Sequence, residues 1–162
     1  MIKTRVLSLV RRLTLARLIF RNSKIEKKRI RFVRYDAKYS KFFSIISATI
    51  DLQDLYAHIH GLGIVKITST PHFSFAMSYL NIIGGEKEAY IKYISKYYPG
   101  EDLHKTQSDF ENTIDYVLND PDKVTILVSA AKEDKILVID GVHRTAAVQA
   151  LGRSSINCAV HF

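Results

Sequence analysis

Residues 136–152 read ILVIDGVHRTAAVQALG, and three structural signals follow one another in this stretch. Ile136 to Ile139 is a largely β-branched apolar run, which favours a strand. Asp140-Gly141 ends this strand, and the alanine-rich segment from His143 to Leu151 predicts a helix. Gly152 stands where a glycine commonly follows a helix C-terminus. The stretch therefore predicts a strand, a tight turn and a helix.

Two further strands are expected around this unit. Val124 to Ser129 (VTILVS) is a second β-branched apolar run. Residues 131–134 (AKED), which lie between the two runs, indicate the turn of a hairpin. Ile156 to Val160 predicts a final strand after the helix. The C-terminal forty residues thus predict a small sheet with a helix connecting two of its strands.

The Asp140-Gly141 turn is a candidate anion-binding site because it opens directly into a helix. The first N–H groups of a helix lack partners within it, and the helix dipole adds partial positive charge. Gly141 allows a ligand to approach the backbone closely. His143 and Arg144 lie in the first turn, and the guanidinium fork suits phosphate oxygens. The alternative is a plain strand-to-helix turn with two solvated polar residues.

The segment from Val124 to Phe162 resembles the C-terminal half of the ParB/sulfiredoxin superfamily, including its free-serine-kinase-like members. These share the order strand, D-G-x-H-R, alanine-rich helix, L-G and strand, and the resemblance covers about a quarter of the chain. It implies an α+β fold, with a small mixed sheet and helices packed on one side. It also implies a nucleotide-phosphate site formed by Gly141, Val142, His143, Arg144 and Thr145. Asp140 is implied as a catalytic carboxylate or a Mg²⁺ ligand, and His143 as a catalytic residue.

The sequence differs from two branches of the superfamily, the sulfiredoxins and the ParB proteins, at positions that their functions require. Sulfiredoxins carry a reactive cysteine where this chain has Val142, and Cys158, the single cysteine, falls on the expected final strand. The thiol is expected to be buried and unreactive there. Sulfinic-acid repair is therefore not an expected function. ParB proteins have two arginines in the turn and a helix-turn-helix domain after it. Here His143 replaces the first arginine and the sequence ends at Phe162, so operator binding is not expected.

The resemblance extends faintly upstream and suggests a third catalytic residue. Thr70-Pro71-His72-Phe73, followed by the tyrosines Tyr90 and Tyr93, resembles a subgroup with a P-H-F/Y element. His72 is therefore a candidate pocket residue, the alternative being a structural histidine. The superfamily's kinases also need a carboxylate base from the N-terminal half of the chain. The candidates for that base are Asp36, Asp51 and Asp54.

Other side chains that could carry chemistry favour structural roles. His58 and His60 would share one face of a strand, but no third ligand stands near them at metal-binding spacing. Five of the nine tyrosines lie between Tyr79 and Tyr98. They could stack on nucleic-acid bases, but a position at the core edge with the hydroxyl in water is the favoured interpretation.

The positive charge is concentrated at the N-terminus. Residues 1–34 hold twelve Lys or Arg and one acid, a net charge of +11, whereas residues 35–162 hold twelve bases and fifteen acids, a net charge of −3. We therefore divide the chain into a basic arm at 1–34 and a domain at 35–162. Apolar residues at helical spacing, from Val6 to Phe20, make the arm an amphipathic helix that either lies on an anionic membrane surface or packs on its own domain. Interrupting arginines and the lack of a cleavage site argue against a secretory signal.

The middle of the chain gives weaker signals. Strands are expected at Arg29–Tyr35 and Ile64–Ile67, the second ending before Thr70-Pro71. Helices are expected at Phe42–Leu55 and Glu86–Tyr98. A further helix is predicted from Ser108, which with Glu111 fits a capping box, to Asp120-Pro121. Its expected buried stripe is Phe110, Ile114, Val117 and Leu118.

These observations lead to one functional expectation and one alternative. The expected function is nucleotide-dependent phosphotransfer to a small hydroxylated substrate, with ATP or ADP and Mg²⁺ as cofactors. The alternative is a non-catalytic, ParB-like nucleotide- or nucleic-acid-binding module that meets its partner through the arm. One cysteine and no run of 18 apolar residues predict a cytoplasmic protein, either soluble or peripheral at the inner face of the membrane.

Overall fold

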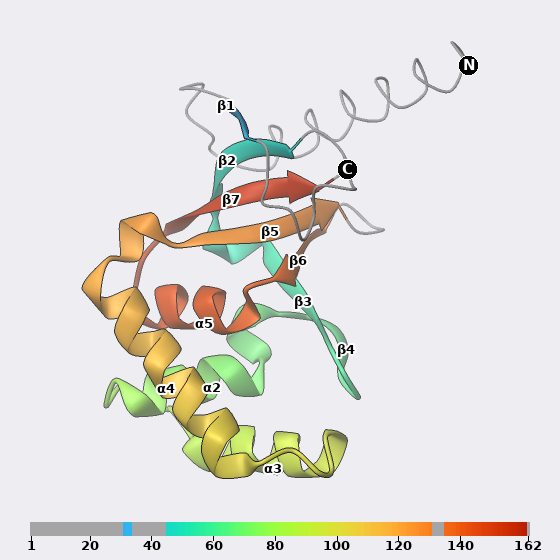
Figure 1. Ribbon diagram of the computed structural model, residues 1–162, viewed down its shortest axis with the longest axis vertical. Coiled ribbons are helices and arrows are strands. Elements are labelled where there is room, and N and C mark those ends of the chain that lie inside the picture. The colour runs from blue at the N-terminus through green and yellow to red at the C-terminus, as the bar shows by residue number, and fades with distance from the viewer. Residues whose placement is uncertain (1–30, 34–44, 131–134, 162) are drawn as a thin grey trace.

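The protein folds around a seven-stranded mixed sheet in the computed structural model, which describes residues 31–33, 45–130 and 135–161 (Figure 1). The strands are β1 (Arg31–Val33), β2 (Ile45–Asp51), β3 (Leu55–Ile59), β4 (Gly63–Lys66), β5 (Thr125–Ala130), β6 (Ile136–Asp140) and β7 (Ser155–His161). The helices are α2 (Pro71–Tyr79), α3 (Lys87–Tyr97), α4 (Leu103–Asn119) and α5 (Val142–Ala150), with 3-10 turns η1 (Leu52–Asp54), η2 (Ile67–Ser69) and η3 (Pro121–Lys123). The expected combination of a mixed sheet with helices is confirmed.

The order of strands in the sheet is β1-β2-β7-β5-β6-β3-β4. The β5–β7 and β3–β6 pairs are parallel, and the other neighbours are antiparallel. The helix α5 connects β6 to β7, which lie on opposite sides of β5. This crossing places the N-terminus of α5 at the end of β6, where the candidate site is expected.

The C-terminal unit has the predicted order of elements. Strands β5 and β6 pair antiparallel, α5 follows at Val142, and β7 closes the unit. Gly152 has a φ of +73°, as expected after the helix. The predictions at Ile64–Ile67 and Glu86–Tyr98 correspond to β4 and α3.

Figure 1 shows the helices that the structure describes, α2 to α5, together on one side of the sheet, with α5 between the sheet and the other three. Five residues of α5 are buried: Thr145, Ala146, Ala147, Val148 and Ala150. Because alanine side chains are small, a helix rich in them can lie close to both layers. The core also takes Phe75 from α2, Tyr90 from α3 and Phe110 from α4, each at most 1% exposed.

The expected helix at Phe42–Leu55 is wrong over its described part. Residues 45–51 form β2, which pairs with β7 from Ile46 to Asp51 and with β1 on its other side. Ile45, Ile46, Thr49 and Ile50 are β-branched and favour a strand. Its partner strand β7 lies about 110 residues later in the chain. For example, the hydrogen bond between Thr49 and Asn157 joins residues that are 108 positions apart. That partner is too distant for a local pattern to indicate.

The helix predicted from Ser108 has its N-cap six residues earlier, at Asp102. The carboxylate of Asp102 accepts hydrogen bonds from the N–H groups of His104 and Lys105 and is the N-cap of α4. Ser108 therefore lies inside the helix, and the capping-box prediction is wrong. The stripe of Phe110, Ile114 and Val117 is buried as predicted. Leu118, however, is 43% exposed.

Thr70-Pro71 begins a helix that was not predicted. The Thr70 hydroxyl accepts a hydrogen bond from the Phe73 N–H, and Pro71 occupies the first position of α2. Threonine at the N-cap followed by proline is a recognised start signal, so the sequence did contain the information. His72 consequently lies in the first turn of a helix.

The described part of the expected arm is β1, which pairs antiparallel with β2. Residues 1–30 and 34, with the expected amphipathic helix, lie outside the described residues. In the part of the chain that the structure describes, no helix has the length and apolar character needed to cross a membrane.

Candidate functional site

The turn from β6 into α5 leaves backbone donors unpaired. Gly141 is the N-cap with a φ of +95°, and it has no side chain to cap the helix. The first hydrogen bond of the helix runs from the Thr145 N–H to the Gly141 carbonyl at 2.8 Å. The N–H groups of Val142, His143 and Arg144 therefore precede the helical hydrogen-bond ladder and can bind an anion.

Two conditions at position 141 require glycine. Its φ of +95° is unfavourable for any residue with a side chain. A Cβ at this position would lie 2.9 Å from Cγ2 of Ile126 and 3.1 Å from Nη2 of Arg144. A side chain there would push on β5 and on the guanidinium together.

The Arg144 side chain is held by two neighbouring groups. Its Nη1 donates to the Thr125 carbonyl at 2.7 Å, and its Nη2 forms an ion pair with Oδ2 of Asp140 at 3.1 Å. The side chain keeps 30% of its surface exposed. Because a guanidinium has five N–H groups, three remain for another acceptor. Arg144 is thus both fixed in position and able to bind a ligand.

Val142 and Thr145, also predicted to bind phosphate, have inward side chains. Val142 packs against the hydrophobic core. Thr145 is fully buried, and both its N–H and its hydroxyl donate to the Gly141 carbonyl at 2.8 Å. Val142 can therefore offer its N–H to a ligand, whereas the two polar donors of Thr145 are already used.

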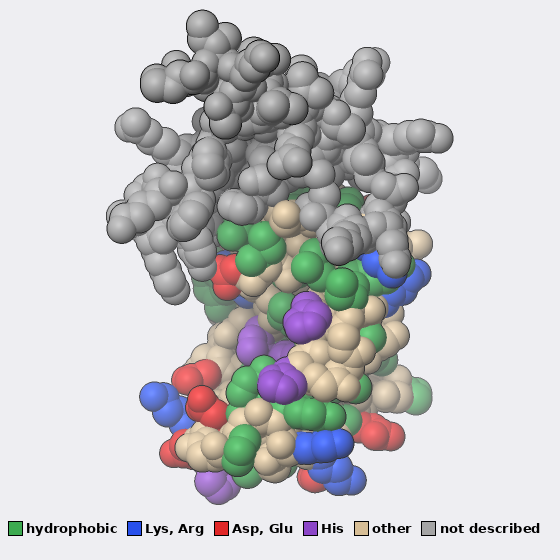
Figure 2. Space-filling model, turned by 90° about the vertical axis from the view of Figure 1, so that its right-hand side faces the viewer, with side chains coloured by type: hydrophobic (Ala, Val, Ile, Leu, Met, Phe, Trp, Pro, Cys, Tyr) green, Lys and Arg blue, Asp and Glu red, His purple; other side chains and the backbone are tan. Residues whose placement is uncertain are grey.

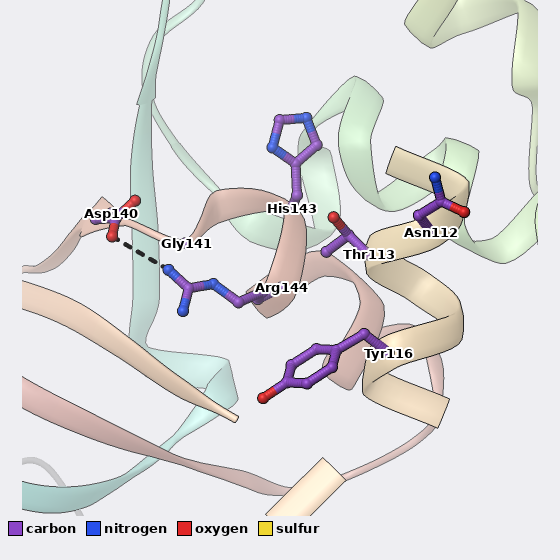
Figure 3. Close-up of a pocket in the computed structure, with 7 residues that line it drawn as sticks. All are labelled: Asn112, Thr113, Tyr116, Asp140, Gly141, His143 and Arg144. Carbon is purple, nitrogen blue, oxygen red and sulfur yellow. Dashed lines mark hydrogen bonds and ion pairs between the residues drawn. The ribbon is translucent and has the colours of Figure 1, made fainter. Parts of the chain in front are cut away.

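The turn opens into a pocket of about 480 Å³, within the usual range for ligand sites (Figure 3). Asp140, Gly141, His143 and Arg144 line it from the β6–α5 turn. Asn112, Thr113 and Tyr116 line it from α4, and sequence reasoning missed these three. They occupy exposed or half-exposed positions of an amphipathic helix, which is the usual place for side chains without a function.

His143 lines the pocket, and its ring also packs in a buried cluster of aromatic side chains. Its Nε2 lies 2.9 Å from the hydroxyl of Tyr90, and its ring centroid lies 4.4 Å from that of Phe110. The His72 ring packs edge-on against His143 at 4.8 Å. We refer to Tyr90, Phe110, His72 and His143, together with Phe75, as the aromatic cluster. Residues of three helices, α2, α3 and α4, thereby fix the ring of His143.

Both histidines of the cluster are neutral at physiological pH. Burial, with a further contribution from Arg144, lowers the pKa of His143 to about 4. Burial, followed by the effect of His143, lowers the pKa of His72 to about 3. A neutral His143 offers one N–H donor and one acceptor nitrogen.

His72, predicted as a catalytic residue, lies behind His143 and is not among the residues that line the pocket. It is 6% exposed, and its Nδ1 is buried without a hydrogen-bond partner in the described part of the chain. In this position it can act on a ligand only through His143.

Of the three candidate bases from the N-terminal half, Asp51 is the one whose side chain the structure describes, and it does not line the pocket. Asp51 accepts a hydrogen bond from the Gln53 N–H and caps η1. Asp36 and the side chain of Asp54 lie outside the described residues. Of the seven lining residues, Asp140 is the one with a carboxylate. It is therefore the described group best placed to accept a proton or to bind Mg²⁺.

The surroundings of the other candidate residues, His58, His60 and Cys158, favour structural roles for them. Histidine side chains gather on the face shown in Figure 2, and His58 and His60 are both exposed. His60 packs against Tyr97 at 5.4 Å. Among residues 31–33, 45–130 and 135–161, no group of three or more His, Cys, Asp or Glu side chains could hold a metal ion. Cys158 is buried on β7, as expected.

The expectation that the tyrosine hydroxyls lie in water is wrong for Tyr90. Tyr90 and Tyr93 are 1% and 7% exposed. The Tyr90 hydroxyl bonds His143, and that of Tyr93 lies 3.3 Å from the hydroxyl of Tyr98. Tyr90 thereby becomes part of the site.

Comparison of the chain with protein-family models, with curated proteins and with solved structures found no match.

Proposed function

We propose that the pocket at the N-terminus of α5 binds the phosphates of a nucleotide and that the protein transfers a phosphoryl group to a small hydroxylated substrate. The observation that carries this proposal is that several hydrogen-bond donors suited to phosphate oxygens converge at one end of the pocket. Three backbone N–H groups of α5 and the fixed guanidinium of Arg144 meet beside a glycine. The likeness of this turn to the D-G-x-H-R turn of the ParB/sulfiredoxin superfamily supports the same ligand.

The residues present fit a Mg²⁺ ion that arrives with the nucleotide. Oδ2 of Asp140 is paired with Arg144, which leaves Oδ1 for a further contact. Mg²⁺ is commonly held by one or two carboxylates together with substrate phosphates, so one carboxylate oxygen is sufficient. When bound, the ion would neutralise charge on the phosphates. Asp140 either holds this ion or accepts the proton of the acceptor hydroxyl.

In the proposed reaction, the protein positions the phosphates and neutralises their charge. Phosphoryl transfer depends mainly on these two contributions. Arg144 and the N–H groups of Val142 and His143 would hold the transferring group. The wall formed by Asn112, Thr113 and Tyr116 would contact the rest of the nucleotide or the acceptor.

The alternative function is a module that binds a nucleotide without turning it over. One observation favours it: the carboxylate of Asp140 is already engaged in an ion pair with Arg144. In this ion pair the carboxylate orients the guanidinium, which is a role that phosphate binding alone would require. Binding without catalysis would need no base at all.

A two-step experiment tests the proposal. Thermal unfolding is measured with ATP, ADP, CTP and GTP, each with and without Mg²⁺, and the best ligand is then used in a hydrolysis assay with a panel of small alcohols. A ligand at 100 times its Kd should stabilise the fold by about 2.7 kcal/mol. Turnover stimulated by an alcohol supports the phosphotransferase, and binding without turnover supports the module. No stabilisation by any nucleotide contradicts both.

A further inference from the structure

The hydrogen bond between Tyr90 and His143 determines which nitrogen of His143 can reach the pocket. The Tyr90 hydroxyl lies 2.9 Å from Nε2 on the buried side of the ring. Nδ1 has no hydrogen-bond partner among the described residues. Unlike Nδ1 of His72, it is not fully buried. Because His143 lines the pocket, Nδ1 is the ring nitrogen available to a ligand there.

The direction of this hydrogen bond follows from the surroundings of Tyr90. Within the described residues, His143 is the hydrogen-bond partner of its hydroxyl, and Tyr90 is 1% exposed. If Nε2 carried the proton, the buried phenol hydrogen would lack an acceptor, which is unfavourable for a buried polar group. Burial raises the pKa of Tyr90, so the phenol keeps its proton. The phenol therefore donates to Nε2.

A neutral histidine whose Nε2 accepts a hydrogen bond carries its proton on Nδ1. We propose that Tyr90 is a positioning residue that fixes this tautomer, so that His143 presents an Nδ1–H donor to a phosphate oxygen in the pocket. The proposal rests on the phosphate-binding function above and adds a role for His143. His143 is a neutral donor there, neither a cation nor a base.

The rest of the aromatic cluster makes this arrangement rigid. Phe110 and His72 pack edge-on against the His143 ring at 4.4 and 4.8 Å. Tyr90 is itself held between Phe75 and Phe110, with ring centroids 5.0 and 5.2 Å away. The ring can thus exchange its two nitrogens only by disturbing these contacts.

The first test reads the tautomer without any ligand. The ¹⁵N chemical shifts of the His143 ring distinguish a protonated from an unprotonated nitrogen. We expect protonated Nδ1 and unprotonated Nε2 in the wild-type protein, and loss of this preference in Tyr90→Phe. Tyr93→Phe is the matched control. The Tyr93 ring packs against His72 while its hydroxyl contacts that of Tyr98, so this substitution removes a phenol hydroxyl that does not contact His143. A protonated Nε2 in the wild-type protein overturns the proposal.

The second test measures binding of inorganic tripolyphosphate by calorimetry, with circular dichroism to verify each fold. Without the Tyr90 hydroxyl, the hydrogen bond from Nδ1–H of His143 to the charged phosphate is no longer favoured, so Tyr90→Phe should weaken binding about tenfold. Tyr93→Phe should leave binding unchanged. His143→Asn places an amide donor near the position of Nδ1 and should bind more tightly than His143→Gln, whose amide mimics Nε2. Unchanged binding and tautomer in Tyr90→Phe overturn this inference alone. No binding to the wild-type protein overturns the phosphate site itself, while the tautomer is still decided by NMR.

Discussion

Acidification from pH 7.5 to pH 5.0 is expected to lower the free energy of unfolding by about 4 kcal/mol, because two histidines are buried in the neutral form. The pKa of His72 is lowered to about 3 and that of His143 to about 4. In the unfolded chain both regain the ordinary value of 6.5.

The sign of this effect follows from proton uptake. Between pH 6.5 and the lowered pKa values, the unfolded chain binds protons that the folded protein does not, so stability rises with pH. Above pH 6.5 the two histidines are largely neutral in both states and do not lower the free energy of unfolding. The loss of stability grows as the pH falls from 6.5 toward 4. At pH 5.0, which is 1.5 units below the unfolded value, each histidine costs about 2 kcal/mol.

Urea unfolding at the two pH values measures this dependence. His72→Phe keeps an aromatic ring in the cluster but removes one titrating group, and it should reduce the loss to about 2 kcal/mol. His104→Asn is the control, because His104 is exposed in the first turn of α4 and should leave the dependence unchanged. A wild-type protein that loses less than about 1 kcal/mol would show that the two histidines are not buried as described.

Replacement of Phe110 by alanine is expected to lower the free energy of unfolding by about 3–5 kcal/mol, the usual cost of deleting a buried aromatic ring. Phe110 is 1% exposed and stacks on Phe75 with ring centroids 4.9 Å apart. Its ring also supports Tyr90 and His143. The substitution would therefore open a cavity directly behind the pocket.

Chemical unfolding of Phe110→Ala beside Leu118→Ala provides the comparison. Both residues are large and apolar and lie on α4, but Leu118 is 43% exposed. The Leu118 variant should lose less than about 1 kcal/mol. Equal losses in the two variants would mean that Phe110 is not the centre of the cluster.

Local sequence signals were sufficient for the C-terminal unit and for one half of the site. The β-branched runs and Gly141 predict β5, β6 and α5 because each signal acts over a few neighbouring residues. The Asp140–Arg144 ion pair is likewise local, with partners four residues apart. An Asp-Gly turn leading into a helix is therefore recognisable without any tertiary information.

The other half of the site depends on contacts that no local pattern encodes. Tyr90 and His143 are separated by 53 residues in the sequence. The α4 wall was missed because Asn112 and Tyr116 occupy the polar face of the helix, which in most helices faces only water. Strand β2 was mistaken for a helix for a similar reason, since its identity is decided by pairing with β7. The sequence thus indicated the donors of the candidate site but neither the opposite wall nor the cluster that fixes His143.

Phosphate binding by Arg144 and the N-terminus of α5 is the central claim, and calorimetric titration of inorganic tripolyphosphate into two arginine variants tests it most directly. Arg144→Ala removes the guanidinium from the pocket, whereas Arg153→Ala removes another arginine that is paired with an aspartate, Asp122, and does not line the pocket. Loss of charge-assisted hydrogen bonds should raise the Kd of Arg144→Ala about 10- to 100-fold, with Arg153→Ala equal to the wild-type protein. Folded Arg144→Ala protein that binds tripolyphosphate as tightly as Arg153→Ala would contradict the account.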